Sequence, residues 1–214
     1  FEAYERWENL PPFDYQIAIS SLPMVFGTNV DTIPAQVPYL TADSAKAAAW
    51  RARLEAAAGG RKKGGIVWQG RPSHPQDRVR SCGLTALVPL MELEGVLPVS
   101  LQVGAGQADL AQHRLGARVF DAGAELKDFS DTAAIVAGLD CVVTIDSAVA
   151  HLTGALARPG FVMLSKAGEW RWMQARSDTP WYPTLTLVRQ QSAGDWGGVV
   201  QRIAGMLRAG PIAS

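Results

Sequence analysis

From residue 65 onward the sequence alternates short apolar runs with segments of helical periodicity, and this alternation restricts the fold more than any other feature. Parallel strands need crossover connections, usually helices, so the pattern predicts an α/β protein with a parallel sheet covered on both faces. The strands are expected at residues 66–68, 98–103, 118–120, 141–145, 161–164 and 185–188. The helices are expected at residues 83–93, 108–115, 132–139, 148–156 and 196–207.

The first 60 residues have a different pattern. Residues 15–20 alternate like a short strand, residues 22–27 can form a brief helix, and Pro34 and Pro38 exclude regular helix between residues 33 and 39. Residues 45–58 predict a helix that Gly59 and Gly60 end, before a basic stretch at 61–65 that we expect to be flexible. We therefore divide the chain into residues 1–60 and a main domain of residues 61–214.

Length and composition limit the classes of protein that are possible. A chain of 214 residues can form one complete domain and part of a second. It begins at Phe1 without a signal-peptide pattern, so we expect a piece of a longer protein. Its 20 basic and 20 acidic side chains provide no general positive field, so we expect no nucleic-acid partner, and any bound anion must be held locally.

Two further features bear on location. Acidic residues interrupt every apolar stretch before it reaches the ~20 residues that a membrane span requires, so we expect no membrane span. Cys82 and Cys141 are the only cysteines, and Cys141 lies in an apolar run where a reduced, buried thiol is typical. We therefore predict a cytoplasmic protein.

The most informative local pattern is the apolar strand 141–145, which turns at Asp146 and Ser147 into a helix of small residues. The first amides of a helix have no internal partner and carry a partial positive charge, so Ser147, Ala148 and Val149 could hold a diphosphate. In the alternative interpretation Asp146 or Ser147 only caps the helix and His151 lies against the core.

A polar loop follows the first strand of the main domain and contains Arg71, His74, Arg78 and Arg80. In an open parallel sheet, loops at the carboxyl ends of the strands form the ligand crevice. These cations could neutralise a diphosphate leaving group, and Arg80, just before a helix, is the best placed. Alternatively, they are solvated surface side chains.

The segment that ends the second strand almost matches the dinucleotide-binding fingerprint. Gly104 and Gly106 supply two of the three glycines, but Asp109 occupies the position of the third. Asp121 follows the next strand, where a ribose-binding acid is typical, so an NAD-type oxidoreductase remains the alternative. The aromatic segments 169–172 and 180–183 either stack on a ligand ring or wedge the last loop onto the core.

Taken together, two consecutive runs resemble the donor-binding segment of glycosyltransferase family 9, which includes the heptosyltransferases. They are FSDTAAIVAGLD at 129–140 and VVTIDSAVAHLTGAL at 142–156. The variant found at the end of bacterial tetratricopeptide-repeat proteins is more similar still. Supporting matches are VW at 67–68, SLQ at 100–102, GAEL at 123–126, WRW at 170–172, PWYP at 180–183 and GDW at 194–196.

The resemblance implies the carboxyl-terminal, nucleotide-binding half of a GT-B fold, with a Rossmann-like parallel sheet flanked by helices. Residues 61–214 would be the donor domain, and residues 1–60 would be a remnant of the acceptor-side domain with a linker helix. The substrate would be a nucleotide-diphosphate sugar, transferred without metal or cofactor. The acceptor, whether a glycan, a lipid-linked sugar or a protein, would bind elsewhere, and a repeat domain could lie upstream.

The resemblance also assigns roles to residues. The catalytic candidates are Arg80 and His151. The expected donor-binding residues are Asp146, Ser147, Ala148 and Val149 at the diphosphate, Gln102 and Gln107 near the base and ribose, and Arg71 and His74 in the basic loop. No carboxylate here matches the family's catalytic base, so we expect this part alone to transfer little or no sugar. A degenerate domain that serves as an interaction module is the third possibility.

Overall fold

The computed structural model describes residues 7–210 and divides the chain into two compact units, Phe1–Pro34 and Ala35–Ser214. The division falls at 34/35 and not at 60/61, where the sequence suggested it. The cause is helix α2 (Ser44–Ala58), which buries Trp50 and Leu54 in the core of the second unit. A helix that shares a core with the sheet belongs to the same unit.

The first unit contains the short helix α1 (Leu22–Val25) and 3₁₀ turns at Trp7–Asn9, Ile19–Ser21 and Val30–Thr32. The expected strand at 15–20 is wrong, because residues 15–18 are irregular and the 3₁₀ turn begins at Ile19. Tyr15, Ile17 and Ile19 are all exposed. Alternation alone does not make a strand when no neighbouring strand is available for its backbone hydrogen bonds.

The second unit is built on a six-stranded sheet in which every neighbouring pair is parallel. The strands are β1 (Lys62–Val67), β2 (Val96–Ser100), β3 (Phe120–Asp121), β4 (Cys141–Ile145), β5 (Gly160–Leu164) and β6 (Leu185–Arg189). Their spatial order is β3-β2-β1-β4-β5-β6, with Ile66 of β1 paired to Ser100 on one side and Val143 on the other. The expected parallel α/β sheet is confirmed.

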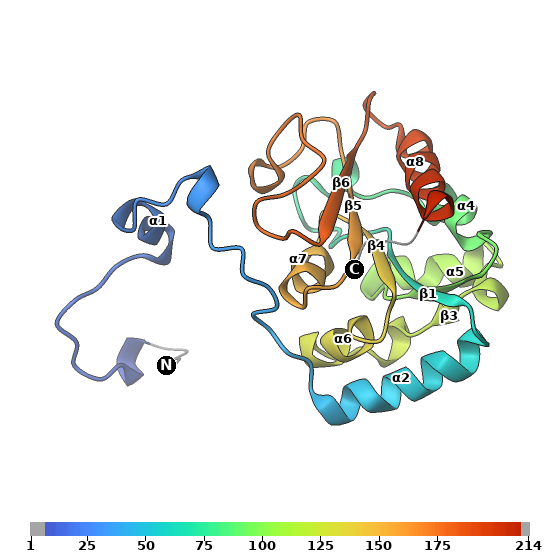
Figure 1. Cartoon of the computed structure of the whole chain (residues 1–214), viewed down its shortest axis with the longest axis horizontal. Coiled ribbons are helices and arrows are strands. Elements are labelled where there is room, and N and C mark those ends of the chain that lie inside the picture. Colours follow the sequence, from blue (N-terminus) through green and yellow to red (C-terminus); the bar gives the residue numbers. More distant parts are fainter. Residues whose placement is uncertain (1–6, 211–214) are drawn as a thin grey trace. The chain divides into compact units, whose positions relative to one another are not determined.

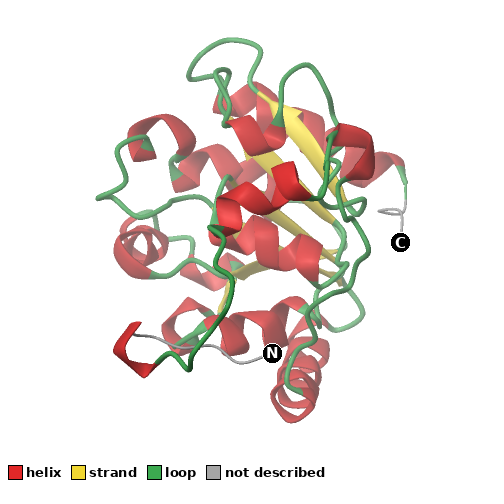
Figure 2. Ribbon diagram, turned by 90° about the vertical axis from the view of Figure 1, so that its left-hand side faces the viewer, coloured by secondary structure: helices red, strands yellow, loops and turns green. Residues whose placement is uncertain are grey.

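Helices cover both faces of the sheet (Figures 1 and 2). On one face, α6 (Phe129–Val136) packs between α2 and α7 (Ala148–Ala155) and contacts both. On the other face, α4 (Val88–Met91) packs against α8 (Trp196–Ala209). The remaining short helices are α3 (Asp77–Arg80) and α5 (Asp109–Gln112). Within the described residues, no helix is both long enough and apolar enough to cross a membrane.

Two expectations about local structure need correction. The stretch 61–65 is not a flexible linker, since β1 begins at Lys62 and lies in the middle of the sheet. The amine of Lys63 is held by Glu55 at 2.8 Å and by Asp140 at 3.3 Å. A side chain at Gly65 would put Cβ 2.6 Å from the Leu139 side chain. Glycine and a paired lysine therefore allow this central strand to pack closely.

The helices expected at 83–93 and 108–115 are shorter and partly 3₁₀. Residues 84–87 form a 3₁₀ turn before α4, and residues 104–108 form another before α5. Of the other predicted helices, the four longer ones agree with α2, α6, α7 and α8 to within about three residues at each end.

Candidate functional site

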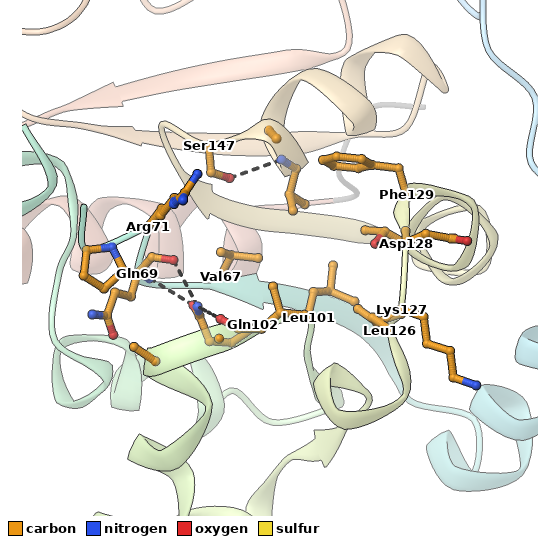
Figure 3. Close-up of a pocket in the computed structure, with 18 of the residues that line it drawn as sticks. Val67, Gln69, Arg71, Leu101, Gln102, Leu126, Lys127, Asp128, Phe129 and Ser147 are labelled. Carbon is orange, nitrogen blue, oxygen red and sulfur yellow. Dashed lines mark hydrogen bonds between the residues drawn. The ribbon is translucent and has the colours of Figure 1, made fainter. Parts of the chain in front are cut away.

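A cavity of about 670 Å³ opens at the carboxyl-terminal edge of the sheet, where β1 lies between β2 and β4. This is the point where the strand order reverses, and open α/β sheets bind ligands there. Four loops form the walls, one after each of β1, β2, β3 and β4 (Figure 3). The lining residues are Val67, Gln69 to Pro72, Arg80, Leu101 to Ala105, Leu126 to Phe129, Thr132 and Ser147 to Val149.

The start of α7 faces this cavity. Ser147 caps the helix, with its hydroxyl accepting the Val149 N–H at 3.2 Å, and it also contacts the Thr144 hydroxyl at 3.0 Å. Ala148 is the first helical residue, so its N–H has no acceptor inside the helix. Ser147, Ala148 and Val149 all line the cavity. The capping interpretation and the anion-binding interpretation are therefore compatible, since the cap occupies one amide and leaves another.

Arg80 lines the same end of the cavity. Its guanidinium donates to the Asp146 carbonyl at 3.3 Å and lies 3.4 Å from the Asp77 carboxylate. Asp77 also accepts the Ser81 hydroxyl at 2.8 Å. A Cβ at Gly70 would lie 2.5 Å from the guanidinium, so the absence of a side chain there lets Arg80 lie across the loop. Arg80 thus places a positive charge beside the helix start.

Asp146 and His151 are not among the lining residues of the cavity. The Asp146 carboxylate accepts the Trp172 indole N–H at 2.8 Å. The His151 ring stacks on Trp172 with centroids 4.9 Å apart, and its Nδ1 lies 3.1 Å from the Tyr182 hydroxyl. Burial lowers the pKa of His151, and the nearby Arg171 lowers it further. Trp172 donates a hydrogen bond to Asp146 and stacks on the His151 ring, so neither side chain reaches the lining. His151 therefore lies against the core, as the alternative interpretation expects.

Gln102 lines the cavity, but its side-chain amide is hydrogen-bonded to backbone groups. Its Oε1 accepts the N–H groups of Trp68 and Gln69 at 3.1 and 3.0 Å. Its Nε2 donates to the carbonyls of Gln69 and Val103 at 3.0 and 2.9 Å. The side chain therefore fastens the loop after β1 to the loop after β2, and it shapes the site through the backbone.

The remaining predicted residues divide into those inside and those outside the lining. Arg71 lines the cavity, whereas His74 and Gln107 are not among the lining residues. His74 is exposed, and its Nδ1 accepts the Gln76 N–H at 3.2 Å within a tight turn. Gln107 lies in the 3₁₀ turn that precedes α5.

Sequence reasoning missed the wall formed by residues 126–129 and Thr132. Phe129 is 62% exposed and Val103 is 50% exposed, so the cavity offers apolar surface to a flat ring. The signal was present, since this segment follows the third strand and parallel strands end at the same edge. Figure 3 shows Phe129 opposite Gln69 and Arg71, with the Lys127 side chain extending away from the other lining residues.

The dinucleotide alternative loses its local support. The Asp109 carboxylate, in the position of the third glycine, accepts the Trp68 indole N–H at 2.8 Å. The glycine-containing segment 104–108 is a 3₁₀ turn, and α5 extends only from Asp109 to Gln112. This junction therefore lacks the long helix whose first amides bind a pyrophosphate in the fingerprint.

The aromatic segments serve mainly as wedges. Trp172 is fully buried, and Tyr182 packs beside it in a second apolar cluster with Leu164, Leu185 and Leu187. Trp170 is 73% exposed and contacts Trp181 edge to face at 6.4 Å.

Across residues 7–210, no group of three or more His, Cys, Asp or Glu side chains is placed to hold a metal ion. Both cysteines are free and buried, and burial raises the pKa of each thiol to about 12.

Strand order and cavity position define a doubly wound, Rossmann-like α/β domain with its crevice at the switch point of the sheet. No family model matches the chain. Protein FlbA of Caulobacter vibrioides is 29% identical over 212 residues, which is 97% of this chain and 35% of that protein.

Among solved structures, E. coli ADP-heptose LPS heptosyltransferase II is similar with a TM-score of 0.56 and 17% identity, over 84% of this chain and 55% of that one. E. coli heptosyltransferase WaaC with ADP gives a TM-score of 0.49 and 18% identity, over 90% of this chain and 57% of that one. The likeness to heptosyltransferase II confirms the expected fold, a Rossmann-like half of the GT-B type. The chain spans little more than a third of Protein FlbA and about half of heptosyltransferase II.

Proposed function

We propose that this chain is the donor-binding domain of a glycosyltransferase and that its cavity holds a nucleotide-diphosphate sugar. The observation that carries the proposal is the convergence of Arg80 and the open start of α7 on one end of the cavity. The donor class is taken from the ADP-heptose in the name of heptosyltransferase II, whose fold the chain shares.

The proposed binding mode assigns each end of the cavity a part of the ligand. The diphosphate lies against Ser147, Ala148 and Arg80, where a hydroxyl, an amide and a guanidinium can donate to it. Arg71 supplies a second positive charge from the same side. The nucleobase and ribose extend toward the apolar surface that Phe129 and Val103 offer to the cavity.

The chemistry follows from this placement. Transfer forms a bond between the acceptor oxygen and the anomeric carbon while the bond from that carbon to the diphosphate oxygen breaks, and the leaving diphosphate takes the electron pair. Donors already in place stabilise that growing charge without reorganising, so the proposed reaction needs no metal or cofactor. The acceptor hydroxyl must also lose a proton to a base. Asp128 is the carboxylate among the lining residues, and it is occupied as the N-cap of α6.

We infer that the catalytic base, which takes the proton of the acceptor hydroxyl, and the acceptor site belong to another part of the whole protein. Residues 1–34 would form the last part of the acceptor-side domain, and residues 35–214, with their linker helix α2, would form the donor domain. The acceptor is a glycan, a lipid-linked sugar or a protein, and an upstream repeat domain is compatible with the sequence resemblance. Two free, buried thiols suit the reducing cytoplasm that we propose as its location.

Calorimetric titration of the chain with ADP, UDP, CDP and NAD tests the proposal. We expect a nucleoside diphosphate to bind and Arg80→Ala to weaken it about 10- to 150-fold, since a hydrogen bond to a charged group contributes ~1.5–3 kcal/mol. The matched control is Arg78→Ala, which removes the same charge from an exposed position outside the lining.

The alternatives predict other results. Tighter binding of NAD than of every nucleoside diphosphate would support an oxidoreductase. Binding of none of the four would favour an interaction module, and equal losses in Arg80→Ala and Arg78→Ala would show that the cavity is not the site.

A further inference from the structure

One wall of the cavity is bracketed by two carboxylates that a single helix holds. The wall is the stretch 126–129, which follows Glu125 and ends two residues before Asp131. Glu125 pairs with Arg53 and Asp131 pairs with Lys46, both on α2. Neither Arg53 nor Lys46 lines the cavity.

The contact between Arg53 and Glu125 is bidentate. The two terminal guanidinium nitrogens donate to the two carboxylate oxygens at 2.8 and 2.6 Å. The guanidinium also lies 4.3 Å from the centre of the Trp50 ring and 5.8 Å from that of Phe120. Trp50 is 8% exposed, so the arginine is held over a ring that is itself fixed in the core. This geometry restricts Arg53 more than an ordinary surface ion pair would.

The second contact reaches the backbone of the wall. The amine of Lys46 donates to one Asp131 oxygen at 2.6 Å, while the other Asp131 oxygen accepts the Lys127 N–H at 3.1 Å. The Asp131 N–H in turn donates to the Asp128 carboxylate at 2.9 Å, which caps α6. One carboxylate therefore joins α2 to the lining residues through a continuous set of hydrogen bonds.

The other contacts of the wall are within its own segment or partly buried: the Asp128 carbonyl accepts the Thr132 hydroxyl at 3.0 Å, and Leu126 packs partly buried against the core. Phe129 is 62% exposed, and Leu126 closes only a 3₁₀ turn, with its N–H 3.3 Å from the Gly123 carbonyl. A loop with exposed side chains and few backbone bonds opens easily unless its ends are anchored. The anchors here are side chains of α2, a helix that buries Trp50 and Leu54 in the core.

We propose that α2 sets the position of this cavity wall, with Arg53 and Lys46 as positioning residues for the ligand. The inference deepens the proposed function and rests on it for its effect on affinity. Its structural part, the control of residues 126–129 by α2, holds whether or not a nucleotide binds.

Charge reversal with rescue tests the proposal. Arg53→Glu, Glu125→Arg and the double variant are compared by hydrogen exchange of the amides at 126–129 in the ligand-free protein and by the Kd for ADP. Each single variant is expected to exchange faster at 126–129 and to bind about 2- to 30-fold more weakly, the usual range of coupling through residues that do not touch a ligand. The double variant is expected to recover much of both.

The matched control is the exposed pair Arg118–Glu92, which has the same 2.6 Å separation as the closest Arg53–Glu125 contact and lies outside the lining. Arg118→Glu should leave exchange at 126–129 and the Kd unchanged. Circular dichroism of each variant establishes that it is folded. Lys46→Glu breaks the second ion pair, between Lys46 and Asp131, and is expected to raise exchange in the same wall.

Unchanged exchange at 126–129 in Arg53→Glu and in Lys46→Glu would overturn the inference, even if ADP binds well. Faster exchange in the single variants without recovery in the double variant would also overturn it, since the pair would then not be the cause. Faster exchange that the double variant reverses, in a protein that binds no nucleotide, would leave the wall assignment standing and refute the proposed function instead.

Discussion

Replacing Gln102 by leucine should destabilise the protein by removing the side chain that joins two cavity loops. Gln102 is 2% exposed, and its amide makes four hydrogen bonds to the backbone. At ~0.5–1.5 kcal/mol for each net hydrogen bond, the loss could reach about 2–6 kcal/mol. Water from the cavity can reach some of the freed groups, but Trp68 is fully buried, so we expect about 2–4 kcal/mol.

Urea unfolding, with free energies extrapolated linearly to water, measures this loss. The exposed Gln112→Leu is the control and should change the free energy of unfolding by less than about 0.5 kcal/mol. Gln102→Glu keeps the shape but turns a carboxylate oxygen toward two carbonyls, so it should also destabilise at neutral pH and recover partly when protonated. A loss below about 1 kcal/mol in Gln102→Leu would refute the assigned bonds.

Two further predictions concern the packing behind the cavity. Gly154→Ala would place Cβ 2.3 Å from the Tyr182 ring and should lower the free energy of unfolding by about 1–3 kcal/mol. Gly205→Ala has open space around the new Cβ and should raise the free energy of unfolding by ~0.5–1 kcal/mol. If urea unfolding gave both changes the same sign, this packing would be contradicted. Burial lowers the pKa of His151 below its ordinary 6.5, so the unfolded state gains the proton first as pH falls below that value. Stability should therefore decline through this window until the folded state is protonated too, and it should decline less in His151→Gln; identical pH dependence of unfolding in both proteins would show that His151 contributes nothing.

Much of the fold could be predicted because several strands, β4 and β5 above all, are buried and largely apolar runs and the longer helices have their own periodicity. The sequence-based predictions failed where contacts with other segments of the chain, and not the local pattern, decide the structure. Residues 15–20 alternate but find no neighbouring strand, and residues 61–65 look like a basic linker but form β1. Lys63 can lie in a central strand only because Glu55 and Asp140 reach it, and neither pairing is visible in a local pattern.

The site was predictable at the level of loops and less so at the level of side chains. The placement of Ser147, Ala148 and Arg80 follows from the rule that parallel strands end at one edge of the sheet. The directions of Asp146 and His151 depend on Trp172, a contact distant in sequence that competes for both side chains. Whether the lining residues bind a donor stays a prediction.

An amide NMR titration of ¹⁵N-labelled protein with a nucleoside diphosphate tests most directly the claim that the start of α7 and the loop of Arg80 hold a diphosphate. With the diphosphate bound there, the largest shifts are expected at the Ala148 amide and at Gly70, with smaller shifts at 126–129 and loss of the Ala148 shift in Arg80→Ala. Shifts that centre instead on the exposed Trp170, or a spectrum that the nucleotide leaves unchanged, would show that the diphosphate does not bind at the start of α7.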